Sequence, residues 1–218
     1  MTVSKIFLDM LLPGLRDTLF MVLVSTLFAV VIGFIPAIVL IITDEKGLKP
    51  NKALNSALNF VINLLRSFPF IILMIAIFPL TRLIVGTTIG IKAAIVPLTI
   101  GAAPFASRVI ESALKEVDPG IVEAAKSFGA STSQIIFKVM IKEALPSIVL
   151  GITLTVINVI GYSAMAGTIG AGGLGDIAVR YGYQRFKTDI MIYTVIILII
   201  VVQILQGLGN FAYRKLSK

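Results

Sequence analysis

The chain has 218 residues, 57% of them hydrophobic, and a mean hydropathy of +1.02, which excludes an ordinary soluble domain and predicts membrane spans. It contains no cysteine and no histidine, so disulfides, thiol catalysis, Cys/His zinc sites and histidine general bases are excluded. The formal net charge is +8, but the basic residues lie between apolar runs, which is typical of membrane-protein loops and argues against nucleic-acid binding.

The first membrane span is predicted over residues 18–43. This stretch is uncharged, and about 20 apolar residues suffice to cross the hydrocarbon core. It is too long for the apolar region of a signal peptide and has no obvious cleavage site. The charged residues 1–17 are expected to form an interfacial lead-in, and Pro36 predicts a tolerated kink or, alternatively, a hinge.

A polar stripe marks the next segment. After a lysine-bearing loop over 44–52, asparagine recurs at every fourth position, at Asn51, Asn55, Asn59 and Asn63. Spacing of four keeps side chains near one helical face, so this stripe should face protein or water. A second span is predicted over 59–80.

Arg66 lies within this second span. A charge at mid-bilayer costs about 2.5–3.5 kcal/mol on insertion scales, so Arg66 needs a partner or a wet cavity. The alternative is that it lies near the cytoplasmic end and snorkels. Asn63 and Arg66 are therefore candidates for lining a membrane pathway.

Three further spans are predicted: a proline-kinked one over 90–107, then 147–166 and 190–213, followed by a tail over 214–218. Pairs of small residues spaced by four, such as Ala102 and Ala106, are weak evidence for helix dimerisation. Residues 170–175 fit G-x-G-x-x-G, but they follow a span rather than a strand. A dinucleotide site is therefore rejected in favour of close backbone packing or a mobile constriction, and no P-loop exists in the chain.

The polar segment 108–146 carries signals for two short helices. Asp118 and Pro119 predict a helix start, and Gly129 predicts its stop. Ser131 and Gln134 are spaced as a capping box for a second helix, and Pro146 marks the entry to the next span.

This segment resembles the cytoplasmic loop of permease subunits in bacterial ABC importers. The resemblance is carried by Glu123-Ala124-Ala125, then Gly129, then residues 139–141, with Lys142 in the usual proline position. Segments 66–72, 93–99, 101–105 and 161–167 resemble the methionine-import permeases, and this similarity covers nearly the whole chain.

The resemblance implies an all-α integral membrane protein of the type I ABC importer permease family, with five transmembrane helices and a cytoplasmic two-helix coupling loop. It implies a homodimer, two ATP-binding cassette subunits docked inside, and a substrate-binding lipoprotein outside. The chain itself would be non-catalytic, without cofactor, and would translocate D- and L-methionine across the bacterial inner membrane. The ATPase-coupling residues would be Glu123, Ala124, Ala125 and Gly129.

Met165 lies among small residues at the end of the fourth span. Its flexible apolar side chain suits a pathway gate, with core packing as the alternative. Five spans place the termini on opposite sides. Eleven basic residues against seven, with Arg66 left out, favour a cytoplasmic C-terminus and an external N-terminus.

Two other functions remain open at this point. One is a permease for a different amino acid. The other is a secondary transporter, which would need intramembrane acids that the predicted spans lack.

Overall fold

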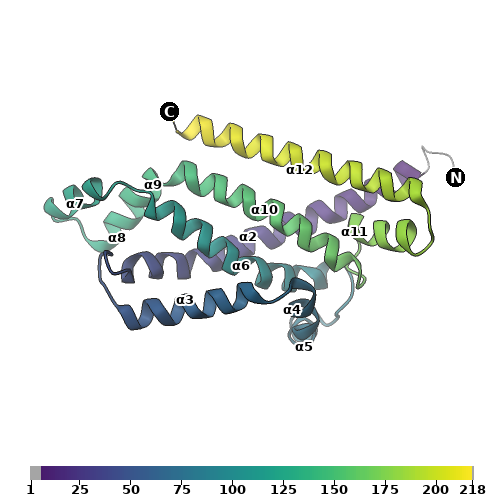
Figure 1. Ribbon diagram of the computed structural model, residues 1–218, viewed down its shortest axis with the longest axis horizontal. Helices are drawn as coiled ribbons and strands as arrows, with labels where there is room; N and C mark the ends of the chain where they lie inside the picture. The colour runs from purple at the N-terminus through teal and green to yellow at the C-terminus, as the bar shows by residue number, and fades with distance from the viewer. Residues whose placement is uncertain (1–5, 218) are drawn as a thin grey trace.

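A computed structural model describes residues 6–217, which form an elongated helical bundle without a strand in that range (Figure 1). Helix α2 (Leu12–Thr43) packs along α6 (Ile91–Lys115), and α10 (Leu145–Gly167) packs against both. Helix α12 (Thr188–Leu216) covers α10, and α3 (Lys52–Ser67) contacts α2 and α6. The predicted all-α fold is confirmed.

Four helices are long and apolar enough to cross a membrane: Phe7–Thr43, Ile91–Lys115, Leu145–Gly167 and Thr188–Leu216. A fifth crossing requires α3 and α4 (Phe70–Ala76) to act together as one broken span. The described residues therefore hold four or five spans, in agreement with the predicted multi-span architecture.

The single helix predicted over 59–80 is broken. Helix α3 ends at Ser67, α4 begins at Phe70, and the two are bent by 100°. Phe68 adopts an extended conformation (φ −71°, ψ 128°), because the ring of Pro69 disfavours helical geometry in the residue before it. Helix α5 (Phe78–Val85) then leads to the turn before α6.

Two predicted boundaries move. The first helix already begins at Phe7, with a π-helical turn η1 (Phe7–Leu11), so most of the predicted lead-in is helical. Gly14 does not break this helix; a Cβ there would collide with the side chain of Ile177, which indicates close packing. Helix α6 runs two turns past the predicted end at residue 107, because its charged side chains are paired within the protein, as described below.

Small residues bring α2 and α6 into close contact. A Cβ on Gly33 would lie 2.6 Å from the carbonyl oxygen of Ala103 and 3.1 Å from Cβ of Ala106. Ala102 and Ala106 are fully buried within the chain. The small-residue spacing in α6 therefore serves packing inside one subunit.

The glycine-rich turn over 170–175 also packs closely. It connects α10 to α11 (Gly173–Ile177) and the π-helical η3 (Ala178–Tyr183). Gly173 has φ +76°, and the amide of Leu174 donates to Oγ1 of Thr18 at 2.8 Å. The prediction of close backbone packing is confirmed here.

Candidate functional site

Two short helical segments project at one end of the bundle. Helix α7 (Pro119–Ser127) lies beyond the end of α6. A continuous helical stretch then follows, made of α8 (Thr132–Gln134), η2 (Ile135–Met140) and α9 (Ile141–Glu143) (Figure 1). The C-terminal end of α12 points toward this end of the molecule, whereas the first helix begins at the opposite end.

Helix α7 starts and stops where its sequence dictates. The Asp118 carboxylate accepts a hydrogen bond from the amide of Gly120 at 2.6 Å. At the other end, Gly129 has φ +75°, its amide donates to Lys126 O, and the amide of Ala130 donates to Ala125 O. This is the paired arrangement of a Schellman motif, so the predicted stop at Gly129 is confirmed.

The second segment is anchored in the bundle. Ser131 and Gln134 exchange side-chain and backbone hydrogen bonds at 3.3 and 2.8 Å, which confirms the predicted capping box. Ile135, Ile136 and Met140 are buried in a cluster with the ends of α2 and α6. The second segment thus holds the first one in place.

Helix α7, in contrast, has no buried residue. Glu123, Ala124 and Gly129 are exposed, and Ala125 is half-buried against the bundle. Phe128, between the end of α7 and Gly129, is 92% exposed. An aromatic side chain so exposed marks an interaction surface. Sequence reasoning missed Phe128, although an aromatic residue next to a helix-stop glycine in a polar segment was a usable signal.

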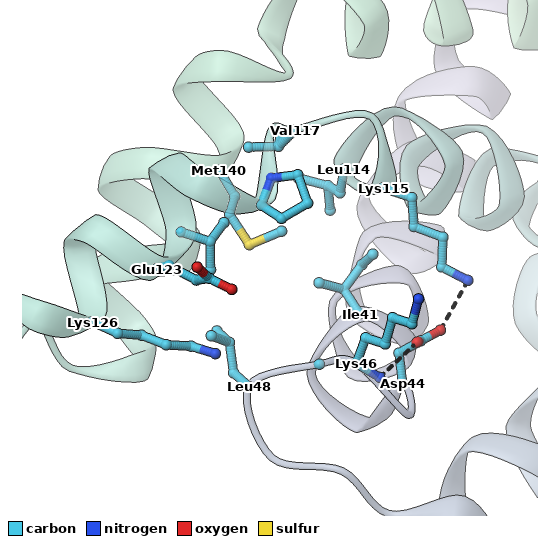
Figure 2. A pocket seen from close by; sticks show the side chains of 13 residues that line it. Ile41, Asp44, Lys46, Leu48, Leu114, Lys115, Val117, Glu123, Lys126 and Met140 are labelled. Atoms are coloured by element: carbon cyan, nitrogen blue, oxygen red, sulfur yellow. Dashed lines mark hydrogen bonds and ion pairs between the residues drawn. The ribbon is translucent and has the colours of Figure 1, made fainter.

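A cavity of about 380 Å³ separates α7 from the loop after α2 (Figure 2). Glu123 and Lys126 approach it from α7, and Asp44 and Lys46 from the loop. Its floor is apolar and includes Ile41, Leu114, Val117 and Met140. The cavity thus lies between α7 and the loop after α2, and charged side chains from both border it.

A charge cluster adjoins this cavity and contributes Asp44 and Lys115 to its lining. We define the cluster as Asn63, Arg108, Glu111, Lys115 and Asp44. Glu111 is 4% exposed, and its carboxylate oxygens lie 2.7 Å from Nη1 of Arg108 and 2.9 Å from Nζ of Lys115. Lys115 also pairs with Asp44 at 3.0 Å, and Arg108 donates to Oδ1 of Asn63 at 2.9 Å. The cluster ties α2, α3 and α6 together.

The ammonium of Lys115 holds the pKa of Asp44 below its ordinary value of 3.8 by donating to the carboxylate, and the amide of Lys46 adds to the effect. Sequence reasoning missed this cluster. The signal was the spacing of Arg108, Glu111 and Lys115, which places three alternating charges on one helical face.

The asparagine stripe faces protein, as predicted. The Asn55 amide donates to Leu40 O at 3.0 Å and to Thr43 Oγ1 at 3.1 Å, and the Asn59 amide donates to Asn55. Asn63 completes the stripe at the charge cluster. Asn63 thus has a partner in the charge cluster, one turn before Arg66 on α3.

Arg66 lines a second cavity, of about 130 Å³, at the break between α3 and α4. Its guanidinium carbon lies 6.0 Å from the ring centroid of Phe105. The rings of Phe70 and Tyr162 stack at 4.3 Å with an interplanar angle of 3° and form another wall. Asn158 of α10 also lines this cavity.

Met165 lies one turn beyond Tyr162 on α10 and is 47% exposed. Asn158, Tyr162 and Met165 follow the i, i+4, i+7 spacing that keeps residues on one helical face. The structure therefore brings Met165 and the Arg66 cavity to the same face of α10. The predicted coupling residues lie at the far end of the bundle (Figure 1). Within residues 6–217 there is no cluster of acidic side chains that could hold a metal ion.

Comparisons with known proteins identify the family. The sequence profile described as "Binding-protein-dependent transport system inner membrane component" matches residues 29–218. The chain belongs to this family. It is therefore an inner-membrane transport component with several membrane-crossing helices.

Two curated relatives illustrate the closeness of the match. A probable D-methionine transport system permease protein MetI of Vibrio cholerae is 51% identical over 209 residues, covering 96% of this chain and 93% of the relative. The methionine import system permease protein MetP of Bacillus subtilis is 46% identical over 179 residues, covering 82% and 81%.

Solved structures agree. An inward-facing structure of the MetNI methionine ABC transporter contains a chain that superposes with a TM-score of 0.96 at 41% identity, with full coverage of both chains. A chain of an amino-acid ABC transporter gives a TM-score of 0.77 at 20% identity, which supports the fold alone. The predicted type I importer permease fold is confirmed.

Proposed function

We propose that this chain is the membrane-spanning permease subunit of an ABC importer for D- and L-methionine. The observation that carries the proposal is α7, a capped helix with the Glu123-Ala124-Ala125 pattern, no buried residue and a glycine elbow at its end. Such a helix presents a surface that suits a partner outside the chain. The names of the Vibrio and Bacillus relatives support methionine as the substrate.

In this proposal α7 docks in a groove of a separate ATP-binding cassette subunit. Ala124 permits close approach, Glu123 offers its charge to a basic partner, and Phe128 supplies an apolar anchor. Ala125 helps to position α7, because its side chain packs on the bundle and its carbonyl oxygen accepts a hydrogen bond from the amide of Ala130. The Gly129 elbow fixes the angle between α7 and the anchored second segment.

The assembly is a homodimer with two ATPase subunits at the cytoplasmic face and a substrate-binding lipoprotein at the outer face. In this proposal ATP binding and hydrolysis belong to the ATPase subunits. The α7 end is cytoplasmic, which places the C-terminus inside and the N-terminus outside. The start of the first helix and the end of α12, which lie toward opposite ends of the bundle in Figure 1, and the excess of basic residues on the α7 side support this orientation.

Closure of the ATPases on ATP moves the two coupling helices together and opens the pathway outward. Met165 is the gate side chain, because it is exposed on α10 away from the coupling end and is flexible and apolar. Met165→Ala should raise the leak of substrate through the transporter in the absence of ATP. Unchanged leak and unchanged ATP coupling would argue against this role.

The test is uptake of labelled methionine by a host that lacks its own methionine permease, with the chain expressed beside its ATPase and binding protein. Wild type should restore ATP-dependent uptake. Glu123→Lys and Gly129→Pro should insert into the membrane but fail to retain the ATPase during purification. Normal ATPase retention in both variants would overturn the coupling assignment.

A further inference from the structure

The cavity beside Arg66 is walled by three polar side chains without an ion pair or hydrogen bond in the described part of the chain, although the guanidinium lies over the Phe105 ring. Within residues 6–217, the Arg66 guanidinium makes no ion pair, and the side chains of Asn158 and Tyr162 make no hydrogen bond. Every other wall of the cavity is aromatic, aliphatic or glycine. One cation, one amide and one phenol therefore converge on an otherwise apolar space.

Arg66 is exposed in the single chain and lies 14 residues beyond Lys52, which is about 21 Å along α3. With Lys52 at the cytoplasmic surface, as the proposed orientation has it, this distance places Arg66 well inside a hydrocarbon core of about 30 Å. A long side chain reaches far less than this distance. A cation at such depth is retained where it faces a wet pathway and an anionic partner.

The aromatic wall is rigid. The Phe70 ring stacks on Tyr162, and a Cβ on Gly101 would lie only 3.0 Å from the Phe70 ring, so Gly101 lets the ring pack against α6. The stack leaves apolar surface beside the guanidinium. This combination suits a ligand that carries a carboxylate next to an apolar side chain.

We propose that this cavity is a binding site within the membrane for the carboxylate end of an amino-acid substrate. This proposal rests on the proposed function as an amino-acid importer. Arg66 binds the carboxylate in charge-assisted hydrogen bonds, Asn158 and the Tyr162 hydroxyl bind the remaining polar groups, and the Phe70 and Tyr162 rings contact the apolar side chain. At about 130 Å³ the cavity holds the carboxylate end and part of the side chain of such a ligand, since a complete ligand pocket has roughly 300 Å³.

The place of the site on α10 fits passage of the substrate. Asn158 lies seven residues before Met165 on the same face, about 10 Å along the axis and on the side of the coupling loop. A substrate that passes Met165 from outside thus meets the Arg66 cavity next. The site would hold the substrate between the gate and the cytoplasmic exit.

The chain offers a clean test because it contains no cysteine. Leu65→Cys introduces one thiol into the cavity wall at a position without a proposed binding role, and Ser217→Cys at the end of α12 is the matched reporter outside it. The complete transporter, with ATPase and binding protein, is treated with N-ethylmaleimide in the resting state and with hydrolysis arrested after ATP binding. Mass spectrometry of the intact permease subunit then reads the labelling rate.

L-Methionine should slow the labelling of Leu65→Cys in at least one of the two states and leave Ser217→Cys unchanged. Methioninamide, which lacks the carboxylate, should not protect. Adding Arg66→Gln should raise the methionine concentration needed for protection roughly 10- to 100-fold, as expected for loss of a charge-assisted bond. With Arg66→Lys, which keeps the charge, the methionine concentration needed for protection should lie between those of Arg66 and Arg66→Gln.

Several results would overturn the site. One is equal labelling with and without methionine in both states, and another is equal protection by methioninamide. A third is unchanged protection in Arg66→Gln. If Arg66→Gln instead separates the permease dimer on size-exclusion chromatography, Arg66 pairs with the other subunit and the proposal is wrong. ATP-dependent methionine uptake by the unmodified transporter is measured in parallel, so that failure of the proposed function is seen separately.

Discussion

The chain carries two groups of charged and polar side chains, and they differ in how well they are paired. In the charge cluster, the buried Glu111 has a cation on each oxygen, and both cations have a second partner. In the Arg66 cavity, a cation, an amide and a phenol line one space, and no acidic side chain within residues 6–217 pairs with the cation. Folding explains the first arrangement, because it satisfies every charge that it buries.

The second arrangement is not explained by folding, since a membrane-embedded cation without a partner only costs free energy. The proposed explanation is a ligand that arrives during transport. On this proposal, complete pairing marks a structural joint in this permease and incomplete pairing marks its pathway. Substitutions that change stability without transport, or transport without stability, therefore test the distinction between the charge cluster and the Arg66 cavity.

The largest effect on stability should come from Glu111→Gln. This change leaves Arg108 and Lys115 close together without their shared anion, and breaking a buried ion pair from one side costs about 3–5 kcal/mol. The thermal unfolding temperature of the purified permease should fall clearly. Glu143→Gln, an exposed position on α9, is the control and should stay within about 0.5 kcal/mol of wild type. Equal melting of both variants would show that the cluster is not a structural joint.

Phe128→Ala should have the largest effect on assembly with little effect on folding. The side chain is 92% exposed, so its removal leaves no cavity in the permease. If it anchors the ATPase, its loss should weaken that complex by about 2 kcal/mol, or roughly 30-fold, in a titration of ATPase binding. Phe186→Ala has similar exposure at the other end of the bundle and should leave binding unchanged. An equal loss of affinity in both variants would remove Phe128 from the docking surface.

Asp44→Asn should have the smallest effect. Its ion pair with Lys115 is partly exposed, and such pairs contribute about 0–1 kcal/mol. Because the pKa of Asp44 is lowered in the folded protein, its contribution is present at neutral pH and above its ordinary value of 3.8. The contribution is lost as the pH falls through the lowered value. Unfolding measured from pH 7 to pH 3 should therefore show a smaller acid-induced loss in Asp44→Asn than in wild type.

Sequence patterns predicted the coupling end better than the pathway end. The caps at Asp118, Gly129 and Ser131 are local chemistry, and each formed as predicted. The break at Pro69 was missed, although the residue before a proline is restricted, because the apolar run continues through it. The pairing of Arg108 with Asn63 joins residues 45 positions apart, and no local pattern predicts it.

The resemblance to methionine-import permeases supplied what local patterns could not, namely the family and the fold. It did not distinguish Asn63 from Arg66, since both lie on the same helix. In the structure their contacts differ, because Asn63 accepts a hydrogen bond from Arg108 and Arg66 lines the cavity. Their roles in transport stay predictions.

The most direct test of the distinction is methionine uptake per folded transporter for Arg66→Gln, reconstituted with its ATPase and binding protein. Arg214→Gln, the same change at the exposed end of α12, is the control. We predict that Arg66→Gln melts within about 0.5 kcal/mol of wild type but loses roughly 10-fold or more of its uptake at limiting methionine. Uptake equal to that of Arg214→Gln, or a loss explained entirely by a lowered melting temperature, would contradict the account.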